Sequence, residues 1–330
     1  MENILSIIIP VYNSALYLRK CLDSLLRQTF CEYEVWLIDD GSTDGSSSIC
    51  DEYVNKDERF HVAHINNAGA SNARNCGIDK SKGKWLAFID SDDYLLSDYL
   101  EKLMGAAKND VGIVLSNYGG RQKDLIIRKS CRLEGMQMVD YFLDNKIFAL
   151  SAPYGKLYNR NIVVENNIRF PIGINMGEDM IFMVDYMNKV NSASLITDSS
   201  YIVNNTDGSL STKYYSYKSE YNCLKLWKKG IELFVSRGAH DNNKKDMLVW
   251  MNRTAGTFYR FCESLYKGPE RLSILKSINL MAQLPYDYYD NFGRCFCPKA
   301  FPAKAKCRLL AKRQFLFYLL LGRLLNVIGK

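Results

Sequence analysis

The first 120 residues predict an α/β fold with a mostly parallel sheet, because strand patterns and helix patterns alternate along them. The opening run, Ile4–Val11, is continuously apolar and rich in β-branched residues, as in a strand that is covered on both faces. A helix pattern with leucines at helical spacing follows from Ser14 to Arg27. The alternation then continues through strand 34–38, helix 44–53, strand 59–65, helix 69–79, strand 84–89, helix 97–108 and strand 111–116.

The composition is that of a globular protein with a hydrophobic core, since 47% of the 330 residues are apolar and 24% are charged. Between about 120 and 210 the pattern is less regular, with a helix at 178–189 and a short strand at 201–205. Beyond about residue 213, long helical patterns cover 217–235 and 247–265. We therefore expect an α/β domain over residues 1–215 and a helical extension over residues 216–330.

The end of the chain is strongly basic. Residues 291–330 contain nine Lys or Arg and no acidic residue, whereas residues 1–290 contain 34 basic and 36 acidic ones. A basic tail at about 299–330 predicts an anionic partner, which is either a membrane surface or a nucleic acid. No nucleic-acid-binding module is recognisable in the sequence, so an anionic membrane surface is the favoured partner.

The tail has the pattern of an interfacial helix when residues 304–330 are drawn as one continuous helix. Its basic side chains then fall within an arc of roughly 100°, and apolar side chains lie opposite. The basic members are Lys304, Arg308, Lys312, Arg323 and Lys330, and the apolar members are Leu310, Phe317, Leu321, Leu324 and Ile328. The longest uncharged run, 314–322, is shorter than the ~20 residues that span a bilayer. The alternatives are a helix packed on the protein's own core and a helix in a homodimer interface.

The cysteines favour a reducing compartment. The ten cysteines are scattered, and none forms a metal-binding pair of the Cys-x-x-Cys type. The first apolar run is too short for a signal peptide, and no cationic segment or cleavage site accompanies it. We therefore expect free thiols and a cytoplasmic location.

Three polar clusters directly follow predicted strands. Val11-Tyr12-Asn13 follows the first strand, Asp39-Asp40 the second, and Asp90-Ser91-Asp92-Asp93 the fourth. Ligands of open α/β sheets bind beyond the carboxyl ends of the strands. The three clusters should therefore converge in space and form a binding site.

The cluster after the fourth strand has the donors that a divalent cation requires. A cation held by one or two carboxylates keeps open positions for phosphate oxygens, which suits Mn2+ or Mg2+ on a diphosphate. We therefore predict that Asp92 binds a metal ion. The alternative is that these residues cap the helix that begins near Ser97.

Two further segments carry polar residues at the head of a predicted helix. In the run 67–75, small residues let a ligand approach, and Arg74 can stabilise phosphate charge. In Gly177-Glu178-Asp179, a carboxylate can act as a general base. The alternatives are a solvated helix face for the first segment and stabilisation of the helix dipole for the second. Asp40 likewise has an alternative role in a capped turn between strand and helix.

Taken together, the motifs resemble those of the family 2 glycosyltransferases. They are SIIIPVYN at 6–13, DDGSTD at 39–44, NAGASNARN at 67–75, FIDSDD at 88–93 and GED at 177–179. The resemblance covers about residues 4–210 and implies the GT-A fold, which contains a Rossmann-like nucleotide-binding half. The Lys156-Leu157-Tyr158 segment is similar to that of bacterial capsule, exopolysaccharide and O-antigen enzymes.

The resemblance also implies roles for individual residues. Asp179 would be the catalytic base, and Asp92 would hold the metal ion. Asp40 would bond the uracil ring, and Arg74 would lie near the phosphates. The whole set expected to bind the donor nucleotide is Pro10, Val11, Tyr12, Asp40, Gly69, Arg74, Asp90 and Ser91. Supporting roles would fall to Asn13, Asn67, Asn75, Asp93 and Glu178.

By the same resemblance, the expected reaction is a single displacement that inverts the anomeric centre and forms a β-glycosidic bond. One hexose or N-acetylhexosamine would pass from a UDP-sugar to a hydroxyl of a polyprenyl-linked oligosaccharide at the inner face of the plasma membrane. Transfer of one sugar per encounter is favoured, because the Gln-x-x-Arg-Trp motif and the multiple membrane spans of processive relatives are lacking.

Other function classes compete with this interpretation. The first is a catalytically inactive GT-A-fold protein that binds nucleotide or glycan, and the presence of Asp92 and Asp179 argues against it. The second is a nucleotidyltransferase or dehydrogenase, but no Gly-x-Gly-x-x-Gly follows the first strand. One departure from the family pattern is Asn204, which stands where similar enzymes often carry Arg ahead of an element such as Ser209-Leu210-Ser211.

Overall fold

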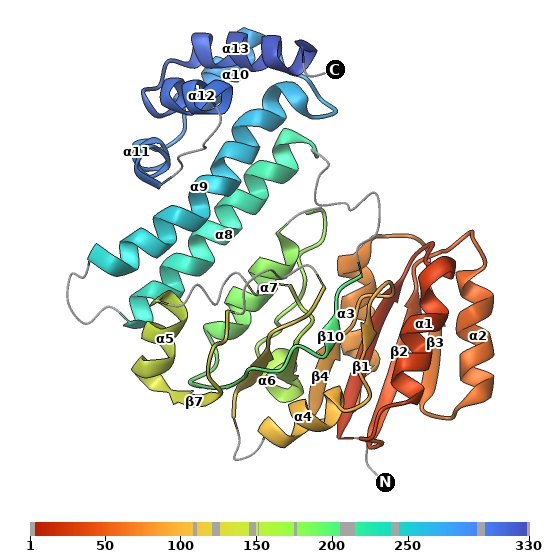
Figure 1. Cartoon of the computed structure of the whole chain (residues 1–330). Helices are drawn as coiled ribbons and strands as arrows, with labels where there is room; N and C mark the ends of the chain where they lie inside the picture. The colour runs from red at the N-terminus through yellow and green to blue at the C-terminus, as the bar shows by residue number, and fades with distance from the viewer. Residues whose placement is uncertain are drawn as a thin grey trace. The chain divides into compact units, whose positions relative to one another are not determined.

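The computed structural model describes residues 4–107, 111–120, 126–144, 150, 152–174, 177–204, 215–238, 244–295 and 301–328. The chain divides into two compact units. The N-terminal unit consists of residues 1–172 and 178–207, and the C-terminal unit of residues 173–177 and 208–330. The sheet belongs to the N-terminal unit, and the described secondary structure of the C-terminal unit is helical (Figure 1).

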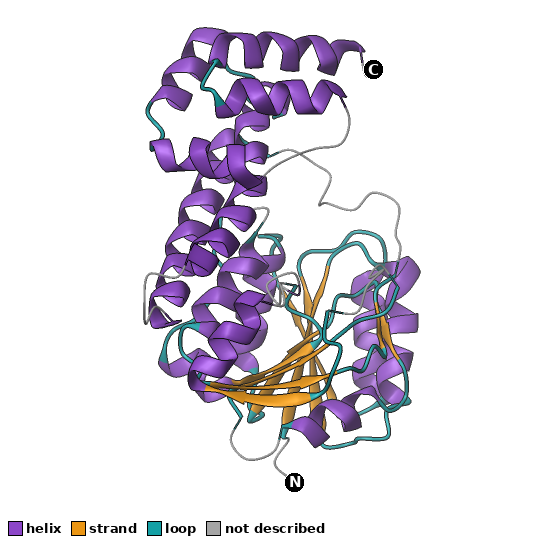
Figure 2. Ribbon diagram, turned by 60° about the vertical axis from the view of Figure 1, so that its left-hand side comes forward, coloured by secondary structure: helices purple, strands orange, loops and turns teal. Residues whose placement is uncertain are grey.

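An eight-stranded mixed sheet forms the centre of the N-terminal unit (Figure 2). Its strands are β1 (Leu5–Val11), β2 (Tyr33–Asp39), β3 (Phe60–His64), β4 (Trp85–Phe88), β6 (Ile113–Ser116), β7 (Cys131–Glu134), β8 (Lys156–Asn159) and β9 (Ser192–Ile196). Their order is β3-β2-β1-β4-β8-β6-β9-β7. The first four strands in that order are parallel to one another, as are β6 and β9, while β8 and β7 run antiparallel to their neighbours. The predicted α/β fold with a mostly parallel sheet is therefore confirmed.

Helices cover both faces of this sheet. They are α1 (Ala15–Leu26), α2 (Ser46–Lys56), α3 (Ala70–Lys80), α4 (Tyr99–Ala106), α5 (Gly135–Asp144), α6 (Arg160–Glu165) and α7 (Glu178–Met187). Ile7 and Ile9 of β1 belong to one core with side chains of α1 and α2, whereas Ile8 faces Gly77 of α3. A Cβ atom at Gly77 would lie 2.3 Å from Cγ2 of Ile8, so glycine is what lets α3 approach β1 this closely.

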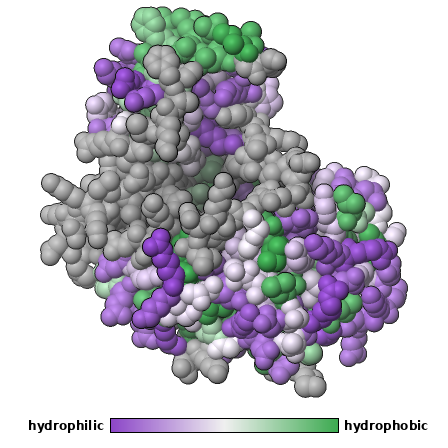
Figure 3. All heavy atoms as spheres, viewed as in Figure 1, coloured by the Kyte–Doolittle hydropathy of each residue, from purple (hydrophilic) through white to green (hydrophobic). Residues whose placement is uncertain are grey.

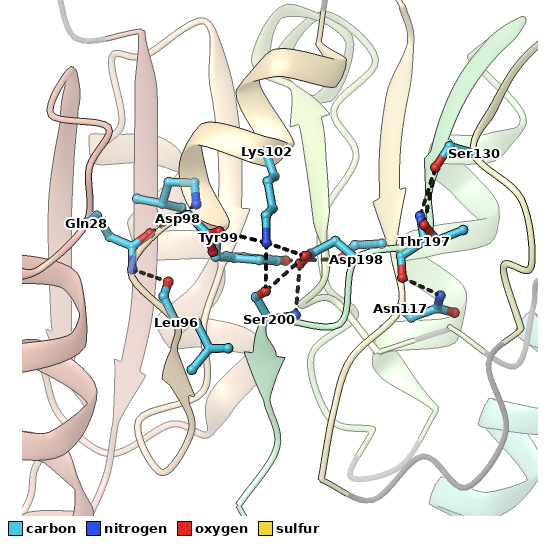
Figure 4. Close-up of polar contacts among 12 residues, drawn as sticks. Gln28, Leu96, Asp98, Tyr99, Lys102, Asn117, Ser130, Thr197, Asp198 and Ser200 are labelled. Atoms are coloured by element: carbon cyan, nitrogen blue, oxygen red, sulfur yellow. Dashed lines mark hydrogen bonds and ion pairs between the residues drawn. The ribbon is translucent and has the colours of Figure 1, made fainter.

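A second, two-stranded antiparallel sheet joins β5 (Tyr94–Leu95) to β10 (Tyr201–Ile202). Polar contacts tie its flanking loops to α4 (Figure 4). The ammonium group of Lys102 lies 2.9 Å from Asp198 and 2.8 Å from Asp98, and it donates to the hydroxyl of Ser200 at 3.3 Å. These contacts fix the start of β10, and with it the position of Tyr201.

The described residues of the C-terminal unit form helices around one hydrophobic core. The helices are α8 (Tyr217–Gly238), α9 (Lys244–Lys267), α10 (Ile274–Ala282), α11 (Tyr286–Cys295), α12 (Phe301–Ala311) and α13 (Phe315–Ile328). Phe258 of α9 packs in this core together with Leu310 of α12 and Tyr318 of α13. The buried carboxylate of Glu263 forms an ion pair with the ammonium group of Lys306, which compensates both charges.

The tail is helical but not one continuous helix, so the single basic arc drawn for residues 304–330 does not exist as drawn. The helix is interrupted between α12 and α13, where Arg313 adopts a left-handed backbone conformation with φ of 56°. Leu310 and Tyr318 are buried, so part of the tail packs against the protein's own core. Lys330 lies outside the described residues. Among the helices that the structure describes, none combines the length and the hydropathy that a bilayer crossing requires.

Candidate active site

The carboxyl ends of three parallel strands meet at one edge of the sheet. Val11 at the end of β1 is in register with Asp39 at the end of β2, and the backbone N–H of Asp40 donates to the carbonyl of Val11 at 2.8 Å. On its other side β1 pairs with β4, which places Asp90 beside the same edge. The predicted convergence of the three polar clusters is therefore confirmed. The strand order changes direction at β1, since β2 and β3 lie on one side of it and β4 lies on the other. Open α/β sheets bind their ligands at such a switch point.

Asn13 ties the end of β1 to the turn that follows β2. Its φ of 48° is a left-handed conformation that asparagine tolerates better than most residues. Its side-chain oxygen accepts the N–H of Thr43 at 2.8 Å, and its own N–H donates to the hydroxyl of Ser42 at 3.1 Å. The neighbouring Tyr12 is 52% exposed, so its ring is available to a ligand, whereas the side chain of Val11 lies in the core.

Asp40 organises the loop that leads into α3. Its buried carboxylate accepts the backbone N–H groups of Ala68 and Gly69, each at 2.8 Å. Gly69 has φ of 91°, a conformation that favours glycine. A carboxylate offers about four acceptor positions, so these two bonds leave Asp40 able to accept from a bound base. Asn67 is exposed in the same loop.

Arg74 links two of the predicted site carboxylates. From α3, its guanidinium group donates to Asp90 at 2.9 Å and to Asp179 at 3.1 Å. The side chain of Arg74 is 6% exposed, while those of Asp90 and Asp179 are 30% and 29% exposed. Asp90 follows β4 and Asp179 lies in the first turn of α7, so one buried cation joins three separate elements. The expected contact of Arg74 with phosphates stays a prediction.

The electrostatics of this group favour a proton acceptor at Asp179. Burial disfavours the charge of Arg74, but the carboxylates of Asp179 and Asp90 outweigh that effect and raise the pKa of the guanidinium group. Desolvation raises the pKa of Asp179 well above the usual range of a carboxyl group, although Arg74 opposes the shift. Glu178 also has a raised pKa, mainly because it is desolvated. One of its oxygens is buried without a hydrogen-bond partner among the described residues.

Aromatic side chains support Arg74 and the segment that leads toward α7. The guanidinium carbon of Arg74 lies 5.3 Å from the ring centre of Phe170, which stacks on Phe182 of α7 at 4.0 Å. The side-chain amide of Asn75 makes two hydrogen bonds, of 2.8 and 2.9 Å, with the backbone of Phe170. Asn75 therefore positions a wall of the site.

Asp93 forms the inner part of the acidic cluster after β4. Its buried carboxylate accepts the hydroxyl of Tyr201 at 2.8 Å and the backbone N–H of Asn204 at 2.9 Å. Both oxygens of Asp93 therefore bond to β10 and the residues after it. The alternative role of Asp93 as a cap of the helix near Ser97 is not what these bonds show. Tyr201 also accepts the N–H of Asp90 at 3.1 Å. Desolvation, helped by the negative charge of Asp90, raises the pKa of Asp93 to about 7.

Asp90 and Asp92 form the outer, half-exposed part of the cluster. Within the part of the chain that the structure describes, no group of three or more His, Cys, Asp or Glu side chains could by itself hold a metal ion. A site with one or two carboxylates is the type in which Mg2+ completes its coordination with water and phosphate oxygens. The accumulated negative charge that raises the pKa of Asp93 also favours a cation here. These donors therefore fit the metal ion predicted at Asp92.

Tyr201 and Lys156 lie close to the site carboxylates, and the sequence alone predicted no site role for either. The ring of Tyr201 stacks on Tyr154 at 4.8 Å. Lys156, the first residue of β8, is buried and donates to the carbonyls of Ala152 and Tyr154 at 2.5 and 3.0 Å. Desolvation lowers the pKa of Lys156 to about 7, with the charge of Asp179 opposing the shift. The signal that could have identified Lys156 is its place in the Lys156-Leu157-Tyr158 segment, by which the sequence resembles bacterial polysaccharide enzymes.

Two further predicted residues lie at the same edge. Pro10 is partly exposed near the end of β1. Ser91 is buried, and its hydroxyl is hydrogen-bonded to that of Ser14 at 2.7 Å. The Ser209-Leu210-Ser211 element lies outside the described residues.

The mixed sheet and its acidic carboxyl edge define a GT-A type fold. The family model described as Glycosyl transferase family 2 matches residues 6–166. EpsH of Bacillus subtilis (strain 168), which is named as a glycosyltransferase, is 30% identical over 256 residues, which are 72% of this chain and 70% of EpsH. The chain belongs to the family 2 glycosyltransferases, as its motifs predicted.

Two staphylococcal proteins are also similar. The poly(ribitol-phosphate) beta-N-acetylglucosaminyltransferase TarP of Staphylococcus aureus (strain N315) is 30% identical over 205 residues, which are 60% of this chain and 62% of TarP. A crystal structure of S. aureus TarS 1-349 in complex with UDP-GlcNAc matches with a TM-score of 0.64 and 19% sequence identity. The match covers 99% of this chain and 92% of the TarS chain, and it shows a shared fold.

Proposed function

We propose that this protein is an inverting, metal-dependent glycosyltransferase that moves one hexose or N-acetylhexosamine from a UDP-sugar to a hydroxyl of a lipid-linked surface-polysaccharide intermediate. The observation that carries the proposal is the pairing of Arg74 with both Asp90 and Asp179. It brings a partly desolvated carboxylate next to the acidic cluster that would hold the donor. The choice of UDP is supported by TarS, which was crystallised with UDP-GlcNAc.

In the proposed mechanism, Asp179 accepts the proton of the acceptor hydroxyl while the hydroxyl oxygen forms a bond to the anomeric carbon. The bond between that carbon and the diphosphate oxygen breaks on the opposite face, and the nucleoside diphosphate leaves. An α-linked donor therefore gives a β-linked product, which is the linkage in the name of TarP. The raised pKa of Asp179 suits this role, because a base is most effective when its pKa lies near the working pH.

The other residues bind and orient the donor. Tyr12 would contact the base, and Asp40 would accept a hydrogen bond from it. Asp92, with Asp90, would hold Mn2+ or Mg2+, and the bound ion would supply positive charge to the leaving diphosphate. Tyr201, through its bonds to Asp93 and to the N–H of Asp90, keeps the backbone of the acidic cluster in place.

The acceptor class and the cellular location are part of the same proposal. TarP is named for poly(ribitol-phosphate), a phosphate-containing polymer, which supports a polymer or its precursor as the acceptor. We place the acceptor on a polyprenyl lipid, with the enzyme working in the cytoplasm at the inner face of the plasma membrane. The excess of basic residues in 291–330 supports this location, because it suits an anionic leaflet.

Thermal unfolding in the presence of nucleotides tests the donor site. The melting temperature is measured with UDP, GDP, dTDP or CMP, each with and without Mn2+. We expect UDP with Mn2+ to raise it in the unmodified protein, because a ligand that binds only the folded state stabilises that state. The same rise is expected in Asp140→Ala, which changes an exposed carboxylate of α5, and should be absent in Asp92→Ala.

Two results would count against the proposal. An equal rise in Asp92→Ala would remove Asp92 from the metal site. No rise with any nucleotide, with or without Mn2+, would contradict donor binding and with it the proposed transferase activity. Release of UDP from UDP-GlcNAc when a polyprenyl-linked saccharide is added then tests the transfer step itself.

A further inference from the structure

One face of α13 is both apolar and exposed. Its members are each 46–72% exposed, and they are Leu316, Phe317, Leu320, Leu324, Val327 and Ile328. We call this set the α13 apolar face. At 100° per residue it occupies an arc of roughly 120° around the helix. Figure 3 shows hydrophobic side chains gathered over the α13 end of the C-terminal unit.

The opposite side of α13 is also apolar, but it is buried. Phe315, Tyr318 and Leu319 lie in the core of the C-terminal unit, and Gly322 lets the helix approach Tyr266 closely. The helix is therefore apolar around most of its circumference. A helix of that kind is normally buried on every side. The described residues of this unit cover only the buried side of α13. A contiguous apolar surface of this kind marks a site of contact with a membrane or another molecule.

The helix and the turn that precede this face in the sequence carry exposed positive charges. Lys304 and Arg308 of α12 are exposed, as are Lys312 and Arg313 in the turn that precedes α13. The last acidic residue of the chain is Asp290, so no carboxylate of α12 or α13 offsets these charges. The partner of this surface must therefore combine an apolar layer with negative charge.

We infer that the α13 apolar face is an interfacial anchor that lies flat in an anionic lipid surface. In such helices the apolar side enters the boundary between headgroups and acyl chains to a depth of about 5–10 Å. Exposed basic side chains of α12 and of the turn before α13 would then contact anionic headgroups. A second copy of the chain fits this surface less well, because a two-fold contact through α13 would bring two identical sets of basic residues together.

This anchor deepens the proposed function and rests on its membrane location, because it names the element that would hold the enzyme at the lipid surface, but lipid binding itself does not depend on sugar transfer. Flotation of the full-length protein with lipid vesicles tests it. One set of vesicles contains phosphatidylcholine alone, and the other contains phosphatidylcholine mixed with the anionic lipid phosphatidylglycerol. We expect the protein to float with the mixed vesicles and to bind the neutral vesicles more weakly.

Two groups of variants separate the apolar and the charged contributions. Phe317→Ser/Leu320→Ser/Leu324→Ser should lower partition into the mixed vesicles by about tenfold or more, because three apolar side chains no longer enter the lipid. Lys304→Gln/Arg308→Gln/Lys312→Gln should lower binding to the mixed vesicles by roughly fivefold per charge and leave binding to neutral vesicles unchanged. The matched control is Leu226→Ser/Leu233→Ser, which changes exposed apolar residues of α8 in the same unit.

Sedimentation velocity of the same proteins distinguishes lipid from a second copy. A dimer that dissociates in the Phe317/Leu320/Leu324 variant, with unchanged vesicle binding, would overturn the inference. Equal flotation of that variant and the α8 control would overturn it as well. Binding of UDP with Mn2+ should be the same in all of these proteins, so a failure of the anchor is distinguishable from a failure of the proposed function.

Discussion

Arg74 and Asp179 are 105 positions apart in the sequence, and the guanidinium group of Arg74 donates to the carboxylate of Asp179 at 3.1 Å. The same guanidinium group donates to Asp90 at 2.9 Å. The proposed base and the acidic cluster therefore share one buried cation. A change at any of the three side chains is expected to alter the charge balance at the other two.

Asp179→Asn is expected to lower the rate of sugar transfer by about 10²–10⁴-fold, because an amide cannot take the proton of the acceptor hydroxyl. Binding of UDP with Mn2+ should change far less than the rate, since Asp179 is not among the residues that would contact the donor or the metal ion, and it reaches Asp90 only through Arg74. UDP release measures the rate, and calorimetry measures the binding. Asp185→Asn, at an exposed position farther along α7, is the control. Turnover of Asp179→Asn near that of the control would exclude Asp179 as the base.

Arg74→Met is expected to lower the free energy of unfolding by about 3 kcal/mol, because the loss of the buried cation leaves two partly buried carboxylates without their counter-charge. The double variant Arg74→Met/Asp179→Asn should recover part of that loss, since a neutral amide needs no cation. Chemical denaturation measures both. Arg19→Met removes an exposed pair with Glu52 and should have little effect. If Arg74→Met is no more destabilising than Arg19→Met, the buried pairs do not stabilise the fold.

The raised pKa of Asp93 predicts that its contribution to stability decreases as the pH rises. The folded-state pKa is about 7, and the unfolded value is roughly 3.9. Between these values the folded protein binds the extra proton, so stability falls with increasing pH, by about 4 kcal/mol in total. Asp93→Asn should remove this decrease. Denaturation at pH 5 and pH 8 checks it, and parallel pH profiles of the two proteins would contradict it.

Gly77→Ala is expected to lower the free energy of unfolding by about 1–3 kcal/mol, because overpacking displaces α3 from β1. The added Cβ would lie 2.3 Å from Cγ2 of Ile8. Gly105→Ala in α4 is the matched control, because its Cβ would meet nothing within 4 Å. That change should raise stability by roughly 0.5–1 kcal/mol. Urea denaturation of both variants tests the prediction, and equal effects would argue against close packing at Gly77.

The five strands predicted in the first 120 residues agree with the structure to within two residues at each end. Their signals are local, because a buried parallel strand is a short apolar run that ends in turn residues. The position of the site could be predicted for the same reason. Asp40 directly follows β2, Asp90 follows β4 after one residue, and both strands are parallel neighbours of β1, so their carboxyl ends lie at one edge of the sheet.

The remaining features depend on contacts between residues that are distant in sequence. β8 has four residues, and only its antiparallel pairing with β4 and β6 makes it a strand of the main sheet. The partners of Arg74 lie 16 and 105 positions away, and Tyr201 reaches Asp93 over 108 positions. The turn at Arg313 contains no glycine or proline. No sequence signal therefore marked the break between α12 and α13, and the arc of basic residues was drawn as if the helix were continuous.

The length of α13 determines what lipid binding would do to a membrane. Its 14 residues extend for about 21 Å, which is less than the ~30 Å thickness of the hydrocarbon core of a bilayer. Lying flat, the helix adds area to one leaflet and none to the other. Each bound molecule would therefore increase the lateral pressure in the leaflet that it enters, and binding would be tightest where outward curvature has already spread the headgroups of that leaflet.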